Sequence, residues 1–452
     1  EPRIVIFRVS GTIELESNLV VSNPFMTVAG HTAPGDGICL KNFTLDIRDT
    51  HVVIVRGIRV RPGIEALEIG KSNDGIDIQN SQDVIIDHCS ASWSTDEILN
   101  TYKDNHDITV QWCIFAESLN NSVHSKGEHG YAATIGGTRA SYHHNLLAHN
   151  KGRNPSIGGN RDRQTKDLDF RNNVVYNWVN RVCDGKPRSM NCVANYYIAG
   201  PATLESQRHL VAEIQPASKY GYSPRWFIQD NYINGYLAEP SAGTRSPAVV
   251  FEEGTTMEKN RVDSPFAHAN YMTRDARNAY EQVLDHAGVI VPHRDGVDKR
   301  VIGDVRSGSA AIGNGIVDKV EEVGGWPELR TFDVPEDSDM DGMPDDWEKA
   351  EGLNINDPWD RFWIKEGEEY DNLERYLNEL ASDRPSLLPP IKLVASQEDE
   401  RKVTLHWKDI TDQEQGFVIQ RSVIGGTFST IDTVHANKTS FTDFPTRMDR
   451  GV

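Results

Sequence analysis

The chain has 452 residues, enough for one large domain and one or two smaller ones, because domains usually contain about 100–200 residues. It carries 67 acidic and 47 basic side chains and a formal net charge of −20, which argues against a general nucleic-acid-binding surface. No apolar run approaches the ~20 residues that a membrane-spanning helix requires. We therefore expect no nucleic acid and no membrane as a partner.

The charge is distributed unevenly along the chain. Residues 333–379 contain 17 acidic and 4 basic side chains, whereas residues 139–188 contain 10 basic and 4 acidic ones. A basic region inside an acidic protein can attract an anionic ligand through its local field. The five cysteines include no CxxC pair, so metal or redox chemistry at cysteine is not expected, and a disulfide between Cys183 and Cys192 is left open.

From about residue 40 to residue 235, short β-prone runs alternate with polar connectors rich in asparagine and glycine. Equivalent positions recur at intervals of 22–36 residues, at Ile58, Cys89, Cys113, Asn145, Asn173, Asn195 and Asn231. A variable repeat of this length is typical of a parallel β-helix, in which each coil stacks on the previous one. A β-sandwich would instead need hairpin turns every ~8–12 residues. The pattern predicts an all-β fold, a parallel β-helix with an internal asparagine ladder.

After the repeats, residues 274–287 have the spacing of an amphipathic helix. Residues 337–348 then match a 12-residue calcium loop, with Gly342 at its sixth position. The predicted ligands of this structural calcium are Asp337, Asp339, Asp341, Met343, Asp345 and Glu348. This loop resembles thrombospondin type 3 and dockerin-like linkers, and the residues from Asn372 resemble their companion helix.

Beyond residue 389, the runs 402–407, 417–421 and 440–443 resemble early strands of a fibronectin type III module, although too few residues follow for the ~100 of a complete sandwich. We expect three parts. These are a β-helix domain over 1–330, a calcium-binding helical linker over 331–385 and a truncated β-sandwich module over 386–452.

Three polar patches in the repeats are separated by about one coil each, so that stacking can place them on one face. They are Ser72–Asp77, Ser92–Glu97 with Asn100, and His124–Lys126 followed by Arg153–Pro155. The first two supply hard oxygen ligands suited to calcium, and the third supplies cations suited to carboxylates.

The order of several motifs resembles polysaccharide lyase family 1, the pectate lyases. The motifs are Asp74, Val84–His88, Trp93–Glu97, His143–Asn145 and Arg153–Pro155, and the similarity extends over roughly residues 1–330. The resemblance implies a right-handed parallel β-helix that cleaves polygalacturonate, an acidic polysaccharide, by calcium-dependent β-elimination. It also implies a secreted, cell-surface or periplasmic protein, which we expect to be bacterial and monomeric.

By the same resemblance, Asp74, Asp96 and Asn100 correspond to the ligands of the catalytic calcium. Ser72 and Asn100 replace carboxylates of the family, which predicts weaker calcium binding unless Glu97 or the substrate completes the shell.

Two basic residues also correspond to positions of the family. Lys126 corresponds to a lysine that binds a substrate carboxylate, and Arg153 to the catalytic arginine. His124 is a further candidate for substrate binding, and Arg161 or Arg163 could replace a second arginine of the family.

Several alternatives remain open. Arginine is almost always protonated near neutral pH, so His124, His129 and His144 are rival candidates for the base. The substrate could be another acidic polysaccharide or methylated pectin. Asn73–Asp77 also resembles polygalacturonases, hydrolases that need paired carboxylates. Finally, the β-helix could bind acidic glycans without catalysis.

Overall fold

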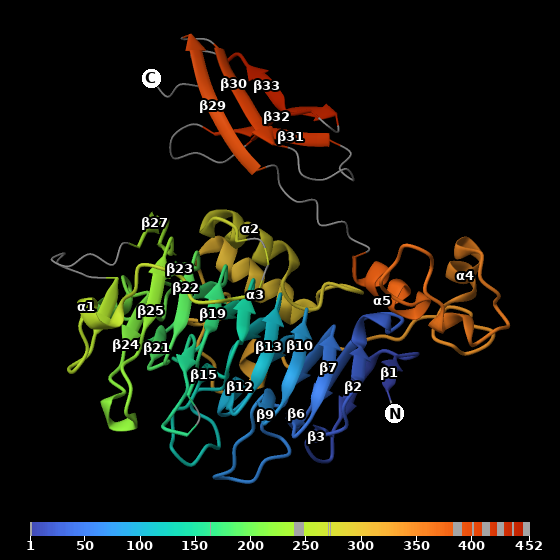
Figure 1. Cartoon of the computed structure of the whole chain (residues 1–452), viewed down its shortest axis with the longest axis horizontal. Helices are drawn as coiled ribbons and strands as arrows, with labels where there is room; N and C mark the ends of the chain where they lie inside the picture. Colours follow the sequence, from blue (N-terminus) through green and yellow to red (C-terminus); the bar gives the residue numbers. More distant parts are fainter. Residues whose placement is uncertain are drawn as a thin grey trace. The chain divides into compact units, whose positions relative to one another are not determined.

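The computed structural model describes residues 2–162, 164–238, 248–269, 271, 273–382, 391–399, 402–408, 416–422, 429–435 and 438–445. Contacts divide the chain into two units, Glu1–Leu373 and Glu374–Val452. In the first unit, the β-prone runs form short strands that stack coil upon coil into three sheets (Figure 1). Every strand pair in these sheets is parallel except β26 with β27, so the predicted parallel β-helix is confirmed.

The strands follow one another from sheet to sheet in each coil. The first sheet contains β1 (Arg3–Ile6), β4 (Met26–Ala29), β7 (His51–Arg56), β10 (Gln82–Asp87), β13 (His106–Gln111), β16 (Ser141–His143), β19 (Leu168–Arg171), β22 (Met190–Val193) and β25 (Trp226–Gln229). The second contains β2 (Gly11–Glu14), β5 (Ile38–Lys41), β8 (Ile58–Arg61), β11 (Ser90–Ser92), β14 (Ile114–Ala116), β17 (Leu146–Ala148), β20 (Val174–Tyr176), β23 (Tyr196–Ile198), β26 (Tyr232–Ile233) and β27 (Tyr236–Leu237). The third contains β3 (Leu19–Val21), β6 (Leu45–Arg48), β9 (Ile76–Gln79), β12 (Glu97–Lys103), β15 (Tyr131–Ile135), β18 (Ser156–Ile157), β21 (Cys183–Gly185), β24 (Ala212–Ile214) and β28 (Val249–Phe251).

The asparagine ladder predicted from the repeats is present between the first and second sheets. The backbone N–H of Asn145 donates to Oδ1 of Asn173 at 3.0 Å, that of Asn173 to Oδ1 of Asn195 at 2.9 Å, and that of Asn195 to Oδ1 of Asn231 at 3.0 Å. The N–H of Cys113 begins the series by donating to Oδ1 of Asn145 at 2.9 Å. Each coil therefore satisfies buried polar groups of the next one.

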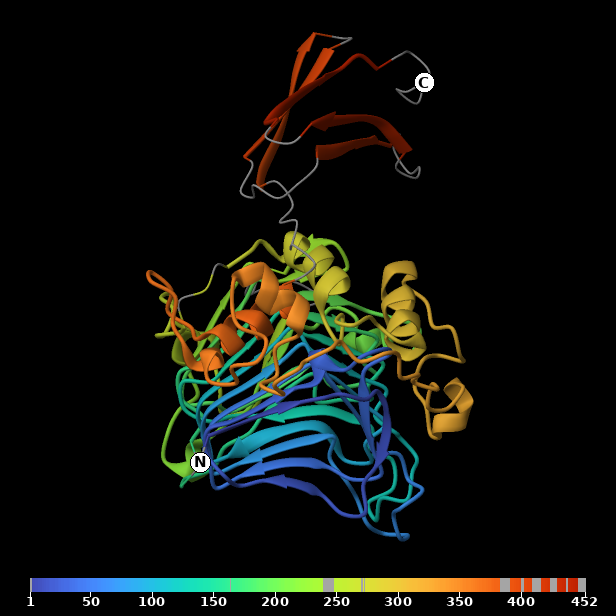
Figure 2. The same cartoon turned by 90° about the vertical axis from the view of Figure 1, so that its right-hand side faces the viewer.

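The three sheets, which Figure 2 shows in a view along the stack, enclose a core of apolar side chains. Outside the second sheet, the helices α2 (Ala276–His286) and α3 (Gly296–Ser307) bury their apolar faces against Ile114, Leu146 and Val174. The helix predicted over residues 274–287 is therefore confirmed. These helices cover the second sheet. The outward face of the third sheet carries polar side chains.

The remaining elements follow the coils. Their helices are α1 (Met257–Asn260), α4 (Asp345–Glu351) and α5 (Asn372–Ser382). In the second unit, one antiparallel sheet contains β29 (Ile391–Asp399), β30 (Lys402–Lys408) and β33 (Ser440–Asp443), and a second pairs β31 (Gly416–Arg421) with β32 (Ser429–His435). Trp407, Phe417 and Ile419 form a small core there. Among the helices that the structure describes, none has both the length and the apolar character that crossing a membrane would require.

Candidate functional site

The outward face of the third sheet carries a row of polar residues at equivalent positions of successive coils. Asp77 of β9 is in register with Asn100 of β12, and Asn100 with Thr134 of β15. Thr134 is in turn in register with Ser156 of β18, and Ser156 with Asp184 of β21. Parallel stacking thus places residues that are 22–34 positions apart in the sequence directly beside one another.

A group of three carboxylates lies at the start of this row. Asp74 precedes β9, Asp96 precedes β12 and Glu97 begins it, and one oxygen from each lies within 4.8 Å of the others. Oδ1 of Asp74 accepts the N–H of Glu97 at 3.1 Å, and Oδ2 accepts Nδ2 of Asn100 at 3.1 Å. The structure therefore brings together Asp74, Asp96 and Asn100, the three residues predicted to hold a catalytic calcium.

The electrostatics of this group of carboxylates indicate that a bound cation would stabilise it. Burial raises the pKa of Asp74 to about 7, and the neighbouring carboxylates of Asp77 and Asp96 add to the shift. In addition, Oδ1 of Asn100 is buried and has no hydrogen-bond partner among the described residues. A carboxylate cluster with an unpartnered amide oxygen fits the hard oxygen ligation that calcium prefers.

Arg153 lies on the other side of the same cluster. Its guanidinium forms an ion pair with Glu97, and Nη1 donates to Oγ1 of Thr134 at 3.3 Å. The guanidinium also lies 4.0 Å from the ring centroid of Tyr131, over which Arg181 lies at 5.7 Å. Burial, followed by the like charge of Arg181, lowers the pKa of Arg153. The predicted catalytic arginine is thus desolvated and adjacent to the carboxylates.

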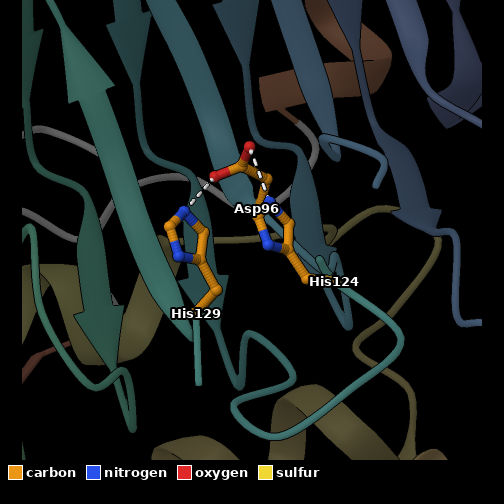
Figure 3. Close-up of side chains that lie close together, drawn as sticks. All are labelled: Asp96, His124 and His129. Carbon is orange, nitrogen blue, oxygen red and sulfur yellow. Dashed lines mark ion pairs between the residues drawn. The ribbon is translucent and has the colours of Figure 1, made fainter. Parts of the chain in front are cut away.

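Two histidines contact Asp96 from the loop that precedes β15 (Figure 3). Nε2 of His124 lies 3.5 Å from Oδ2 of Asp96, Nε2 of His129 lies 2.9 Å from Oδ1, and the two rings stack at 4.1 Å. Nδ1 of His124 accepts the backbone N–H of Lys126 at 3.0 Å. A neutral His124 therefore carries its proton on Nε2, facing Asp96. Burial lowers the pKa of His129.

The other predicted substrate-binding residues are placed less centrally. Lys126 is exposed on the loop between His124 and His129, and Arg161 is exposed on a later loop. Arg163 lies outside the described residues. His144, one of the rival bases, is buried against Trp112 and His143 on the first sheet. The arginine that the structure places beside Arg153 is Arg181, which the sequence reasoning did not select.

A second carboxylate cluster lies in the acidic segment near the end of the first unit. Asp337, Asp339 and Asp341 form one group of close oxygens, and Asp341, Glu348 and Asp360 form another. Burial, followed by the neighbouring carboxylates, raises the pKa of Asp341 to about 6 and that of Glu348 to about 7. The loop predicted to bind calcium therefore does bring most of its acidic side chains together.

The other two predicted ligands of this loop are Met343, whose ligand atom in the motif is its backbone carbonyl, and Asp345. Met343 is buried, and its N–H donates to Oδ1 of Asp341 at 2.8 Å. Both oxygens of Asp345 are engaged by Ser338, whose N–H donates to Oδ1 at 2.7 Å and whose hydroxyl donates to Oδ2 at 2.9 Å. Asp360, which lies outside the loop motif, is the acidic residue that sequence reasoning missed.

Comparisons with known proteins identify relatives of this chain. No family model matches the chain. "Probable pectate lyase C" of Emericella nidulans is 33% identical over 362 residues, which cover 78% of this chain and 77% of that protein. "Probable pectate lyase C" of Aspergillus flavus is 31% identical over 364 residues, which cover 78% of both.

Solved structures give weaker similarities. A pectate lyase from Bacillus sp. N165 in complex with trigalacturonate has a TM-score of 0.41 at 16% identity and covers 65% of this chain and 87% of that one. Pectate lyase C from Erwinia chrysanthemi, solved with Ca²⁺, has a TM-score of 0.36 at 14% identity and covers 62% and 77%.

The two relatives named here are fungal, so the expectation of a bacterial protein is wrong. The motifs that suggested the family did not carry information about the source organism. The chain belongs to the pectate lyase family.

Proposed function

We propose that this chain cleaves polygalacturonate, the de-esterified form of pectin, by calcium-dependent β-elimination to 4,5-unsaturated oligogalacturonides. The observation that carries the proposal is the meeting of a carboxylate cluster at Asp74, Asp96 and Glu97 with the partly buried guanidinium of Arg153. A uronate substrate needs both features, a cation for its carboxylate and a group that acts on its C5 proton. The fungal relatives support the same chemistry through their names.

The proposed ligands of the catalytic calcium are Asp74, Asp96 and Asn100. Glu97 can join them, since its carboxylate lies in the same group. Its ion pair with Arg153 would then exchange for contacts with the metal and the substrate. When bound, calcium supplies a positive charge that stabilises the negative charge developing on the substrate carboxylate.

The residues around this site perform the other steps of the proposed elimination. The C5 proton is acidic because C5 lies next to the carboxylate, and the base removes it as a C4=C5 double bond forms. The electron pair of the C4–O bond leaves with the glycosidic oxygen, which takes up a proton. Lys126 and His124 are proposed to contact substrate carboxylates, and Lys126 is exposed and free to reach them.

We assign the base to Arg153. Its lowered pKa makes loss of a proton easier than for an exposed arginine. His124 is less suited, because its Nδ1 accepts the N–H of Lys126 and its Nε2 faces Asp96. His129 keeps Nδ1 as a possible acceptor and is the rival that mutagenesis must test.

We assign to Arg181 the role that Arg161 or Arg163 was expected to fill. Arg181 lies over the same tyrosine ring as Arg153 and is held by Asp184, whose Oδ2 lies 2.6 Å from Nε of Arg181. A second fixed guanidinium there can bind a substrate carboxylate or keep the pKa of Arg153 low.

For the rest of the chain we propose a secreted, monomeric protein in three parts, 1–330, 331–385 and 386–452. The middle part resembles a thrombospondin type 3 linker and holds a structural calcium in the loop 337–348. The last part resembles a partial fibronectin type III module, in keeping with its antiparallel strands.

The function is tested by incubating the protein with a panel of uronic-acid polymers, including methyl-esterified pectin, and recording ultraviolet absorbance. Elimination creates a double bond conjugated with the carboxylate, which absorbs, whereas hydrolysis does not. We expect the largest rise with polygalacturonate in the presence of calcium. A larger rise with methylated pectin or with another polymer would change the substrate, and no rise with any polymer would contradict the lyase.

A further inference from the structure

The carboxylates of the acidic segment form one continuous cluster rather than two. Asp341 belongs to both groups of close oxygens, one with Asp337 and Asp339 and the other with Glu348 and Asp360. Asp360 follows the loop by 12 residues and belongs to a short helical turn after α4. The chain path between Glu348 and Asp360 therefore returns a fifth carboxylate to the loop.

Six carboxylate oxygens of this cluster are buried and have no hydrogen-bond partner among the described residues. Glu348 and Asp360 are both 0% exposed, and Asp341 is 2% exposed. The atoms that have no hydrogen-bond partner among the described residues are Oδ1 of Asp337, Oδ2 of Asp339, Oδ2 of Asp341, Oε1 and Oε2 of Glu348, and Oδ1 of Asp360. Leaving a buried carboxylate oxygen unpaired is costly, and five carboxylates in one place repel one another.

Asp341 and Asp360 each use their other carboxylate oxygen to accept a backbone hydrogen bond, which orients the side chain. Oδ1 of Asp341 accepts the N–H of Met343 at 2.8 Å, and Oδ2 of Asp360 accepts the N–H of Asn354 at 3.0 Å. The backbone thus fixes one oxygen of each carboxylate and leaves the other for a ligand. Asp345 differs, because Ser338 engages both of its oxygens.

We propose that Asp360 is a direct ligand of the calcium bound by the loop and takes the place that the loop motif assigns to Asp345. This inference rests on the proposal that the loop binds calcium. The ligand set is then Asp337, Asp339, Asp341, Glu348 and Asp360, which offers six unpaired oxygens. Calcium accepts about six to eight oxygen ligands in flexible geometry, whereas magnesium usually retains several waters.

The same site fastens the acidic segment to the first coil. Nη1 of Arg8, which follows β1, lies 3.0 Å from Oδ2 of Asp337, the oxygen not assigned to the metal. Calcium would neutralise the repulsion within the cluster and hold Asp337 in position for Arg8. Asp360 therefore links the metal to the turn beyond α4, and Asp337 links it to the start of the β-helix.

The test compares three substitutions in the full chain after removal of metal with EDTA. Asp360→Asn, Asp341→Asn and Asp345→Asn are titrated with calcium by calorimetry, and their thermal unfolding is recorded with and without calcium. All three retain the active-site carboxylates, so that differences between them report on the loop. We expect Asp360→Asn and Asp341→Asn to weaken the loop's affinity about tenfold or more and Asp345→Asn to change it by less than about threefold.

Stability without metal provides a second readout. Asp360→Asn keeps an oxygen for the N–H of Asn354 and removes an unpaired charge, so it should unfold in EDTA at or above the temperature of the parent. Asp345→Asn weakens the contacts with Ser338 and should unfold earlier in EDTA. If Asp360→Asn does not fold, Asp360→Glu retains the charge but displaces the oxygens, and we expect it to weaken calcium binding as well.

The outcomes distinguish the proposal that Asp360 is a ligand from the proposal that the loop binds calcium. Parent-like calcium binding in Asp360→Asn, together with a loss in Asp341→Asn, would overturn the role of Asp360 and leave the calcium loop intact. A loss in Asp345→Asn as large as in Asp360→Asn would overturn the replacement of Asp345. Parent-like binding in both Asp341→Asn and Asp360→Asn would show that the loop is not a calcium site. A response to magnesium equal to that for calcium would contradict the assigned metal.

Discussion

The two carboxylate clusters of the first unit differ in their partners. At the third sheet, the acidic groups already contact residues of the chain: Glu97 pairs with Arg153, Asp74 accepts from Asn100, and Asp96 faces two histidines. In the acidic segment, the oxygens of Glu348 and one oxygen of Asp360 are unpaired among the described residues. In our proposal, the first arrangement exchanges its partners for calcium and substrate, and a bound cation completes the second.

Acidity alone therefore does not distinguish a catalytic site from a structural one. A site that must bind and release a polymer needs groups that are stable both with and without it. A structural metal site needs no such balance, because its ligands serve only the folded state. The variants below test whether the two clusters are independent in this sense.

The largest effect should follow substitution of Arg153. Arg153→Lys retains a positive charge but loses the planar donor group that pairs with Glu97 and lies over Tyr131. If Arg153 is the base, steady-state kinetics should show kcat lower by about 10²–10⁴-fold and KM little changed. His129→Ala is the matched comparison. Retention of most of kcat in Arg153→Lys together with its loss in His129→Ala would assign the base to His129.

A pair of aspartate variants tests the independence of the clusters. Asp74→Asn should lower lyase activity about tenfold or more at limiting calcium, with partial recovery in excess calcium, because it removes a charged ligand. Asp341→Asn should leave the initial rate at low temperature nearly unchanged and reduce the stabilisation that calcium provides in thermal unfolding. Equal losses of rate in the two variants would show that the clusters act as one.

A contact between the second coil and the segment after α3 should show a different dependence on pH. Arg330 donates to Oδ2 of Asp36 from Nε at 2.9 Å and from its N–H at 2.8 Å, and these bonds lower the pKa of Asp36 from 3.8 to about 2. A lowered pKa stabilises the fold above about pH 4, and this stabilisation is lost as pH falls toward 2.

Asp36→Asn should therefore lower the free energy of unfolding by about 1–3 kcal/mol at neutral pH. The difference from the parent should shrink as the pH falls from about 4 to 2, as measured by denaturant unfolding. A difference that stays constant over this range would show that the carboxylate charge does not contribute.

The smallest effect should come from the exposed lysine of the histidine loop. Lys126→Ala should raise KM for polygalacturonate by a factor of about two to five, since a single exposed ion pair contributes about 0.2–1 kcal/mol. The increase should be smaller at high salt and with methyl-esterified substrate, because screening or esterification removes the same attraction. An unchanged KM at low salt would remove Lys126 from the substrate site.

Much of the fold could be predicted from the intervals between repeated residues. The asparagines at 145, 173, 195 and 231 predicted the stacking that the structure shows. The same intervals could have identified one further neighbour of the site, Arg181. Arg181 follows Arg153 by 28 residues, the interval between Asn145 and Asn173, so the two arginines should lie on adjacent coils.

Other contacts could not be predicted, because they depend on how loops fold back. Asp360 lies outside the calcium-loop pattern, and only the path after α4 returns it to Asp341 and Glu348. Likewise, no sequence pattern predicted that Ser338 would engage both oxygens of Asp345. Such contacts join segments that have no fixed spacing in the sequence, so a periodic pattern cannot predict them.

The most direct test of the account measures two products in one reaction of the unmodified protein with polygalacturonate and calcium. Ultraviolet absorbance counts new C4=C5 double bonds, and a reducing-end assay counts all cleaved glycosidic bonds. Elimination at the site of Asp74, Asp96 and Arg153 predicts one double bond for every cleaved bond, and loss of both signals in EDTA. Reducing ends that appear without a matching rise in absorbance would contradict the assignment of this chain as a lyase.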